Sequence, residues 1–149
     1  MAITTFSAQA RLQEGLVVQT QSRQFKLTVD EPEVLGGTDT GMNPVELVLC
    51  ALGSCQAIVA RVYAPQFGIN LKQFWMELEG DIDIDGFLNK ADVRCGFSEI
   101  RYNIHIESDA SEAKLKEFIT FIGQKCPVGD TLSAPVKLVL SKVVPVSVN

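Results

Sequence analysis

Four cysteines are the residues best suited to covalent chemistry in this 149-residue chain, at Cys50, Cys55, Cys95 and Cys126. No two of them are spaced as C-x-x-C, and the chain has a single histidine, so the sequence holds no zinc-binding pattern. We expect neither a metal nor another cofactor. Two of the cysteines, Cys55 and Cys126, fall on apolar stripes of predicted helices, and these two are the candidates for catalysis.

A buried thiol with a second thiol within reach can reduce a peroxide in two steps. A thiolate attacks the O–O bond and becomes a sulfenic acid, and the second thiol condenses with it to a disulfide. Only the thiolate is nucleophilic, and burial alone raises the pKa of a thiol, so a neighbouring cation is required. Arg11, Arg23 and Arg61 are the candidates. The pattern alone is equally compatible with cysteines that only pack as small apolar side chains.

The element that must position Cys55 is a long helix predicted over residues 43–62. Asn43 is a good N-cap, and Pro44 suits the first helical position. Cys55 lies on an apolar stripe formed by Val48, Leu52, Val59 and Val62. The other faces are also mostly apolar, so we expect this helix to need a partner that covers it. Glu46, Gln56 and Arg61 interrupt the run, which argues against a membrane span.

A second helix is predicted to position Cys126. We expect it to begin at Asp109 as N-cap, with Glu112 three residues later as in a capping box. Its apolar stripe consists of Leu115, Phe118, Ile119 and Ile122. Cys126 continues that stripe, and Pro127 ends the helix. If the two apolar faces pack together, the sulfur atoms of Cys55 and Cys126 can be neighbours despite their separation in sequence.

Alternating segments predict the strands. Residues 4–12, 16–22 and 24–30 should form an antiparallel meander, residues 71–83 and 92–107 a further pair, and residues 137–146 a last strand. The order is three strands, a helix, two strands, a helix and a strand. Strands grouped apart from helices predict an α+β fold with antiparallel sheets, in a single domain over residues 1–149.

Composition and charge narrow the class of protein. Hydrophobic residues make up 46% and charged residues 21%, as in ordinary soluble globular proteins. The formal net charge of -5 gives no electrostatic basis for binding nucleic acid. Residues 1–12 lack the basic start and apolar run of a signal peptide, so we expect a cytoplasmic protein with reduced cysteines and no membrane partner.

Two motifs carry a family resemblance. The loop and helix VLGGTDTGMNPVELVLCALGSC, followed by KCPVGDTL after the second helix, resemble the OsmC/Ohr family of osmotically inducible and organic-hydroperoxide-resistance proteins. The resemblance covers most of the chain. It implies an intertwined homodimer in which antiparallel sheets wrap two long central helices, with active sites at the subunit interface.

The resemblance also implies roles for individual residues. Cys55 would be the peroxidatic cysteine and Cys126 the resolving one, in a thiol-dependent reduction of organic hydroperoxides with a lipoyl-type dithiol as reductant. Arg11 is the nearest match to the arginine that the family draws from its first strands. Two other functions stay open on the same scaffold: a non-catalytic carrier of a small hydrophobic ligand, and a redox sensor.

One position departs from the family pattern. Peroxidase members carry a glutamate directly after Asn-Pro, where this chain has Val45, and Glu46 comes one residue later. On a straight helix Glu46 lies on the side of the axis opposite Cys55 and roughly 13 Å away along the axis. We therefore expect Glu46 to hold the arginine or to act from the partner subunit.

Three other patterns have alternative explanations. Residues 81–92 place carboxylates and a glycine much as an EF-hand loop does, but the alternating flanks favour a strand that ends in an Asp-Gly turn. The glycine-rich loop at residues 36–41 lacks the phosphate-binding spacing and lysine. His105 lies on the polar face of its strand, and a Cys–His hydrolase would require that face to meet Cys55. Trp75 is expected to have an ordinary packing role.

Overall fold

The computed structural model describes residues 2–146. The chain forms two compact units: the first comprises the residues up to Gly53 together with Met76–Ile104, and the second comprises Ser54–Trp75 together with the residues from His105 onward. The elements in chain order are β1 (Gln9–Leu12), β2 (Val18–Ser22), β3 (Phe25–Val29), η1 (Glu33–Leu35), α1 (Pro44–Tyr63), η2 (Ala64–Phe67), β4 (Leu71–Asp81), α2 (Ile84–Phe87), β5 (Glu99–Ser108), α3 (Glu112–Lys125) and α4 (Pro127–Ser133).

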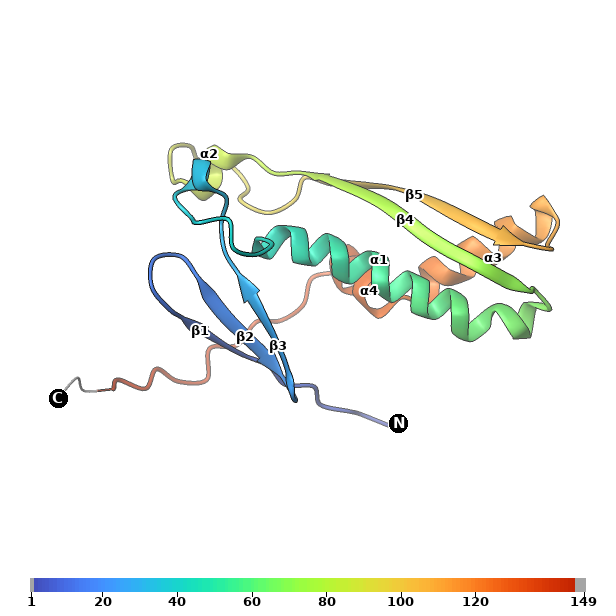
Figure 1. Cartoon of the computed structure of the whole chain (residues 1–149), viewed down its shortest axis with the longest axis horizontal. Coiled ribbons are helices and arrows are strands. Elements are labelled where there is room, and N and C mark those ends of the chain that lie inside the picture. Colours follow the sequence, from blue (N-terminus) through green and yellow to red (C-terminus); the bar gives the residue numbers. More distant parts are fainter. Residues whose placement is uncertain (1, 147–149) are drawn as a thin grey trace. The chain divides into compact units, whose positions relative to one another are not determined.

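The predicted α+β class with antiparallel sheets is confirmed. In the first unit β1, β2 and β3 form the expected meander, in which Arg11 of β1 stands opposite Gln19 of β2 (Figure 1). Gly15, at φ 62°, supplies the left-handed residue that the first turn requires. β4 and β5 form the second sheet. The long helix is also confirmed, because α1 begins at Pro44 and ends at Tyr63.

The prediction of a last strand over residues 137–146 is wrong. This segment contains neither helix nor strand, and all of its side chains are exposed. Its alternating apolar residues have the composition of a strand, but a strand is stable only when its backbone groups pair with a neighbouring strand. Within the described part of this chain, the segment has no such neighbour.

In the first unit, a single carboxylate organises the glycine-rich loop. Asp30 is 1% exposed, and its oxygens accept hydrogen bonds from the N–H of Glu31 and from both the N–H and the hydroxyl of Thr38 and of Thr40, at 2.6–3.1 Å. These bonds, led by the Thr38 hydroxyl, hold the pKa of Asp30 well below its usual range. The loop N–H groups thus surround a carboxylate of the chain itself.

Helix α1 begins with a reciprocal cap. The Asn43 Oδ1 accepts from the Glu46 N–H at 2.9 Å, and the Glu46 Oε2 accepts from the Asn43 N–H at 2.8 Å. This capping box satisfies two backbone donors that a helix start otherwise leaves free. Gly53 then lets the helix approach β4 closely, because a Cβ at this position would lie 2.9 Å from Leu78 Cδ1.

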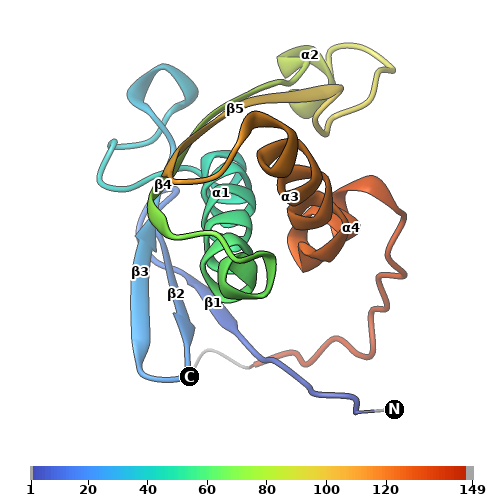
Figure 2. The ribbon, with the colours of Figure 1, turned by 90° about the vertical axis from the view of Figure 1, so that its right-hand side faces the viewer.

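The core of the second unit lies between α1 and α3. Ala60 of α1 and Phe118 and Ile122 of α3 are all 0% exposed, and the two helices lie side by side in Figure 2. The small Ala60 allows the larger side chains of α3 to pack directly against the helix backbone. Phe67 closes one end of this core, with its ring centroid 5.1 Å from that of Phe118.

Helix α3 begins two residues later than predicted. Its N-cap is Ser111, whose side chain accepts from the Lys114 N–H, and not Asp109. The Asp109 carboxylate accepts instead from the Asn70 N–H at 2.9 Å, so it ties the turn before β4 to the end of β5. A tertiary contact has therefore displaced the local cap that the sequence suggests.

The acidic segment at residues 81–92 is also not an Asp-Gly turn. It contains the short helix α2, which Asp83 caps by accepting from the Asp85 N–H. Asp81, at the end of β4, forms an ion pair with Arg101 of β5, and this lowers the pKa of the Asp81 carboxyl. Arg101 also binds Glu79 and Glu99. The segment follows a strand, whereas an EF-hand loop follows a helix.

By length and composition alone, residues Pro44–Phe67 would suffice to cross a membrane, with a mean hydropathy of 1.7. The central helix of a water-soluble domain can meet the same criterion. Within the second unit, one face of this segment packs on α3 through Val59, Ala60 and Ala64. The absence of a membrane partner stays a prediction.

Asp30 predicts a specific pH dependence of stability. Because its folded-state pKa lies below the unfolded value of about 3.9, Asp30 stabilises the fold fully above that value and loses this contribution as the pH falls further. We expect Asp30→Asn to lower the melting temperature at neutral pH and to flatten its decline between about pH 5 and pH 2.

Asp39→Asn is the matched control, because Asp39 lies in the same loop but is exposed and has a left-handed backbone that asparagine also adopts. Thermal melts that show the same acid slope for Asp30→Asn and the parent chain would contradict this account of the loop.

Candidate functional site

The second unit brings together the two cysteines that the sequence singles out. Cys55 lies on α1 one turn before Val59, and Cys126 lies one turn after Ile122, directly after α3. Val59 and Ile122 both belong to the core between these helices. Because residues four apart share a helix face, the packing of α1 on α3 carries both sulfur atoms to the same end of this core.

The two thiol groups are neighbours, close enough for Cys55 to influence the pKa of Cys126. Cys126 is 1% exposed and Cys55 is partly exposed, and both are free thiols. Burial raises the pKa of the Cys126 thiol, and the neighbouring Cys55 thiol raises it further.

Cys126 has a second role that the sequence did not reveal. Its sulfur accepts from the Gly129 N–H at 3.2 Å, which makes Cys126 the N-cap of helix α4. Pro127 occupies the first position of that helix. The signal was present in the sequence, since proline is favoured at the first helical position and cannot continue the preceding helix, but we used Pro127 only as the end of α3.

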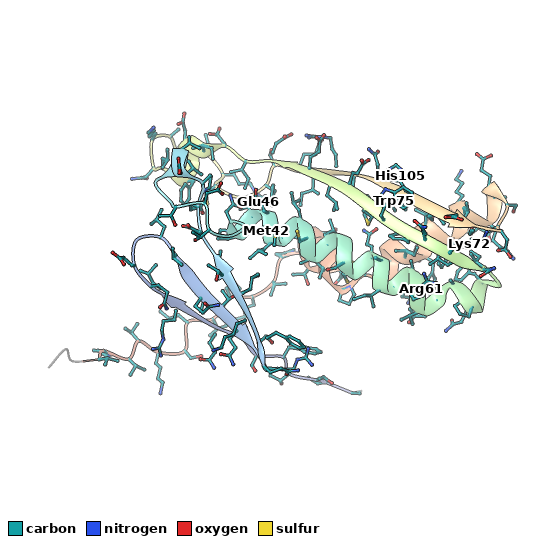
Figure 3. The ribbon with its side chains drawn as sticks, in the orientation of Figure 1. Met42, Glu46, Arg61, Lys72, Trp75 and His105 are labelled. Carbon is teal, nitrogen blue, oxygen red and sulfur yellow. The ribbon has the colours of Figure 1, made fainter. Side chains whose placement is uncertain are left out.

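The candidate cations have different environments. Arg61 donates to the carbonyl oxygens of Leu71 and Lys72, the latter at 3.2 Å, and Figure 3 shows it near Lys72. Arg23 lies over the ring of Phe25, with its Cζ 4.9 Å from the centroid. Arg11, on β1 in the first unit, is exposed and forms no ion pair with any of residues 2–146.

Glu46, the candidate carboxylate, is occupied in the capping box at the start of α1. It belongs to the first unit and is exposed. Its hydrogen bond to the Asn43 N–H uses one carboxylate oxygen, Oε2, so the other oxygen retains its capacity to accept.

The remaining cysteines and the histidine lie elsewhere. Cys50 and Cys95 are exposed, and the Cys50 thiol donates to the Met42 sulfur at 3.8 Å. His105 stacks on Trp75 with ring centroids 4.7 Å apart and planes 3° apart (Figure 3). Since Phe74 and Ile106 pack against the core, alternation along the strands directs Trp75 and His105 to the opposite face. His105 therefore does not face the thiol pair.

Residues 2–146 contain no group of three or more His, Cys, Asp or Glu side chains placed to hold a metal ion.

Comparisons with known proteins all point to the same family. Residues 37–141 match the model of the family described as OsmC-like protein. A hydroperoxide reductase of Mycoplasma pneumoniae is 32% identical over 124 residues, which is 83% of each chain, and one of Mycoplasma genitalium is 27% identical over the same share.

Solved structures agree with this match. An OsmC-like protein from Mycoplasma pneumoniae has a TM-score of 0.78 and 29% identity, with 89% of each chain covered. An organic hydroperoxide resistance protein from Legionella pneumophila, at 22% identity, shares the fold with a TM-score of 0.67 over 89% of this chain and 91% of its own.

The burial of Cys126 predicts its reactivity. Because a raised pKa lowers the thiolate fraction and burial limits access, we expect iodoacetamide to modify Cys126 more slowly than Cys50 or Cys95 near pH 8. Mass spectrometry of the native, reduced protein would measure each rate. Equal rates at Cys126 and the two exposed cysteines would refute the described environment, and urea-unfolded protein, in which all four should react alike, is the control.

Proposed function

Because the chain belongs to the family of OsmC-like proteins, we propose that it is a thiol-dependent peroxidase that reduces organic hydroperoxides through Cys55 and Cys126. One observation carries the proposal: two thiols that are distant in sequence are neighbours at one end of an apolar core. The relatives named hydroperoxide reductase support a peroxide-related function.

In the first step, the Cys55 thiolate attacks the terminal oxygen of R–O–O–H. The S–O bond forms as the O–O bond breaks, and the alkoxide RO⁻ leaves and takes a proton to become an alcohol. Cys55 becomes a sulfenic acid, so sulfur is oxidised by two electrons and the peroxide is reduced by two. Partial exposure suits Cys55 to this role, because a peroxide must reach its sulfur.

In the second step, the Cys126 sulfur attacks the Cys55 sulfenic sulfur. The S–S bond forms, the S–O bond breaks, and hydroxide leaves with the Cys126 proton as water. The two thiols are neighbours, and their sulfur atoms must approach one another to the S–S length of about 2.05 Å. Burial protects Cys126 from direct attack by peroxide, which favours Cys55 as the first thiol to react.

The disulfide must then be reduced by an external dithiol. One thiolate of the dithiol attacks a disulfide sulfur, and its second thiolate displaces the mixed disulfide, which returns both cysteines to thiols. We propose a lipoyl-type dithiol for this step, because a flexible chain that ends in two thiols can reach a partly exposed sulfur.

We also propose that the protein acts as a homodimer. On α1, Ile58 is 63% and Val62 is 57% exposed, on a helix whose opposite face packs on α3. Residues 137–146 expose further apolar side chains and have the alternation of a strand without a neighbour in the described chain. A second copy would cover both surfaces and lower their exposure to water.

Arg11 is the proposed activating cation, and Glu46 the proposed carboxylate that orients it. The support for Arg11 is its availability: it has no ion pair with any described residue, whereas Arg61 is bound to backbone carbonyls. The support for Glu46 is the free acceptor capacity of its second carboxylate oxygen.

The peroxidase proposal predicts distinct effects of the two cysteines. With cumene hydroperoxide and a dithiol, Cys55→Ser should reduce turnover to the uncatalysed rate. Cys126→Ser should allow one oxidation without disulfide formation, so the Cys55 sulfenic acid should accumulate and be trapped by dimedone. Peroxide consumption and intact-protein mass spectrometry measure both results.

Cys95→Ser is the matched control and should turn over like the parent chain. Cys55→Ser with parental activity would eliminate the mechanism. A parent chain that oxidises once but does not cycle would indicate a sensor, and one that never oxidises would leave the carrier of a hydrophobic ligand as the remaining function.

Removal of the proposed cation should change how the rate of Cys55 oxidation depends on pH. Arg11→Met should slow the oxidation of Cys55 at neutral pH by about tenfold or more and move the pH–rate profile to higher pH, whereas Arg11→Lys should retain much of the rate. Stopped-flow oxidation at several pH values provides the measurement. Arg23→Met, in the turn between β2 and β3, is the control, and an unchanged pH profile for Arg11→Met would exclude Arg11 as the activating group.

A further inference from the structure

Two polar or charged residues in the described chain are buried, Asp30 at 1% and Gln56 at 3% exposure, and they differ in their partners. Asp30 accepts hydrogen bonds from three residues of its loop. The Gln56 amide forms no hydrogen bond with any group of residues 2–146. Burial without a partner is rare for an amide that has two donors and an acceptor, and such a group calls for an explanation.

The end of the Gln56 side chain is nevertheless reachable. Among the described residues, no buried side-chain nitrogen or oxygen is both sealed from solvent and without a hydrogen-bond partner. Since the Gln56 amide has no such partner, its polar atoms must keep some contact with solvent. Its side chain is thus covered almost completely, while its hydrogen-bonding end still touches solvent.

The Gln56 side chain lies beside the proposed reaction centre. Gln56 follows Cys55 directly, so their Cα atoms are about 3.8 Å apart. Val59 and Ala60, each four residues after one of the pair, are core residues that pack with α3. Cys55 and Gln56 therefore share the face of α1 that meets the α3 end where Cys126 lies.

We propose that Gln56 is a catalytic residue of the peroxidase reaction, and that its amide N–H donates a hydrogen bond to the alkoxide oxygen that leaves when the Cys55 thiolate breaks the O–O bond. The proposal rests on the proposed function. The S–O bond forms, the O–O bond breaks, and the developing RO⁻ is held by the amide until it takes a proton from water.

The chemistry of the neighbouring groups favours this assignment. Cys126 is proposed to act as the attacking thiol of the second step, so a different group is needed as the donor for the departing oxygen in the first step. A neutral amide can stabilise the departing oxygen without a charge of its own. A fixed donor in a site that largely excludes water stabilises developing charge more than an exposed one does.

The test compares two reactions of the same sulfur in the full-length, reduced protein. Gln56→Leu should slow the single-turnover oxidation of Cys55 by cumene hydroperoxide about 10²-fold, because one donor to a developing oxyanion is lost. Alkylation of Cys55 by iodoacetamide, in which iodide leaves and no oxygen needs a donor, should change by less than twofold. The melting temperature should stay equal or rise, since leucine has no unpaired polar group to bury.

Matched variants separate this role from a structural one. Gln124→Leu, at an exposed position of α3, should leave both rates and the melting temperature unchanged. Gln56→Asn, which keeps the amide donor, should recover part of the oxidation rate.

Three results would overturn the role of Gln56: an unchanged oxidation rate in Gln56→Leu, equal slowing of oxidation and alkylation, or a loss of melting temperature or of subunit association that marks a structural hydrogen bond. A parent chain that alkylates at Cys55 but does not react with the hydroperoxide would instead refute the proposed function itself, and the role of Gln56 with it.

Discussion

The direct packing of α1 on α3 is the constraint on which the thiol pair depends. Ala60 and Phe118 have no exposed surface, and the small alanine permits an approach that a larger side chain would prevent. Cys55 lies one turn before Val59 of this core, and Cys126 lies one turn after Ile122, directly after α3. Their proximity is thus a result of apolar burial elsewhere, and neither sulfur has to stabilise the arrangement by itself.

The two buried polar residues illustrate how a fold separates stability from chemistry. Asp30 is enclosed by donors, so its charge fixes the loop that leads into α1. The Gln56 amide has no hydrogen bond with residues 2–146, and a buried polar group without a partner is sensitive to any ligand that supplies one.

Local patterns predicted the elements well and the junctions less well. The apolar stripes gave α1 and α3, and the alternation gave β1 to β5, because both follow from burial of one face. Asp109 was misassigned as a cap because its carboxylate is used in a contact with Asn70, 39 residues away. Residues 137–146 were misassigned because, among the described residues, no neighbouring strand pairs with them. The apolar stripes predicted that Cys55 and Cys126 could be neighbours. Helix α4 and the burial of Gln56 became evident only from the three-dimensional structure.

The sulfur of Cys126 is at once the acceptor that holds the first turn of α4 and an atom able to change its covalent state. A disulfide sulfur stays at the same position in the chain but is a weaker acceptor for a backbone N–H than a thiol or thiolate sulfur. If Cys126 forms the proposed disulfide, its oxidation would weaken the cap of α4, so the stability of this short helix would differ between the reduced and oxidised protein.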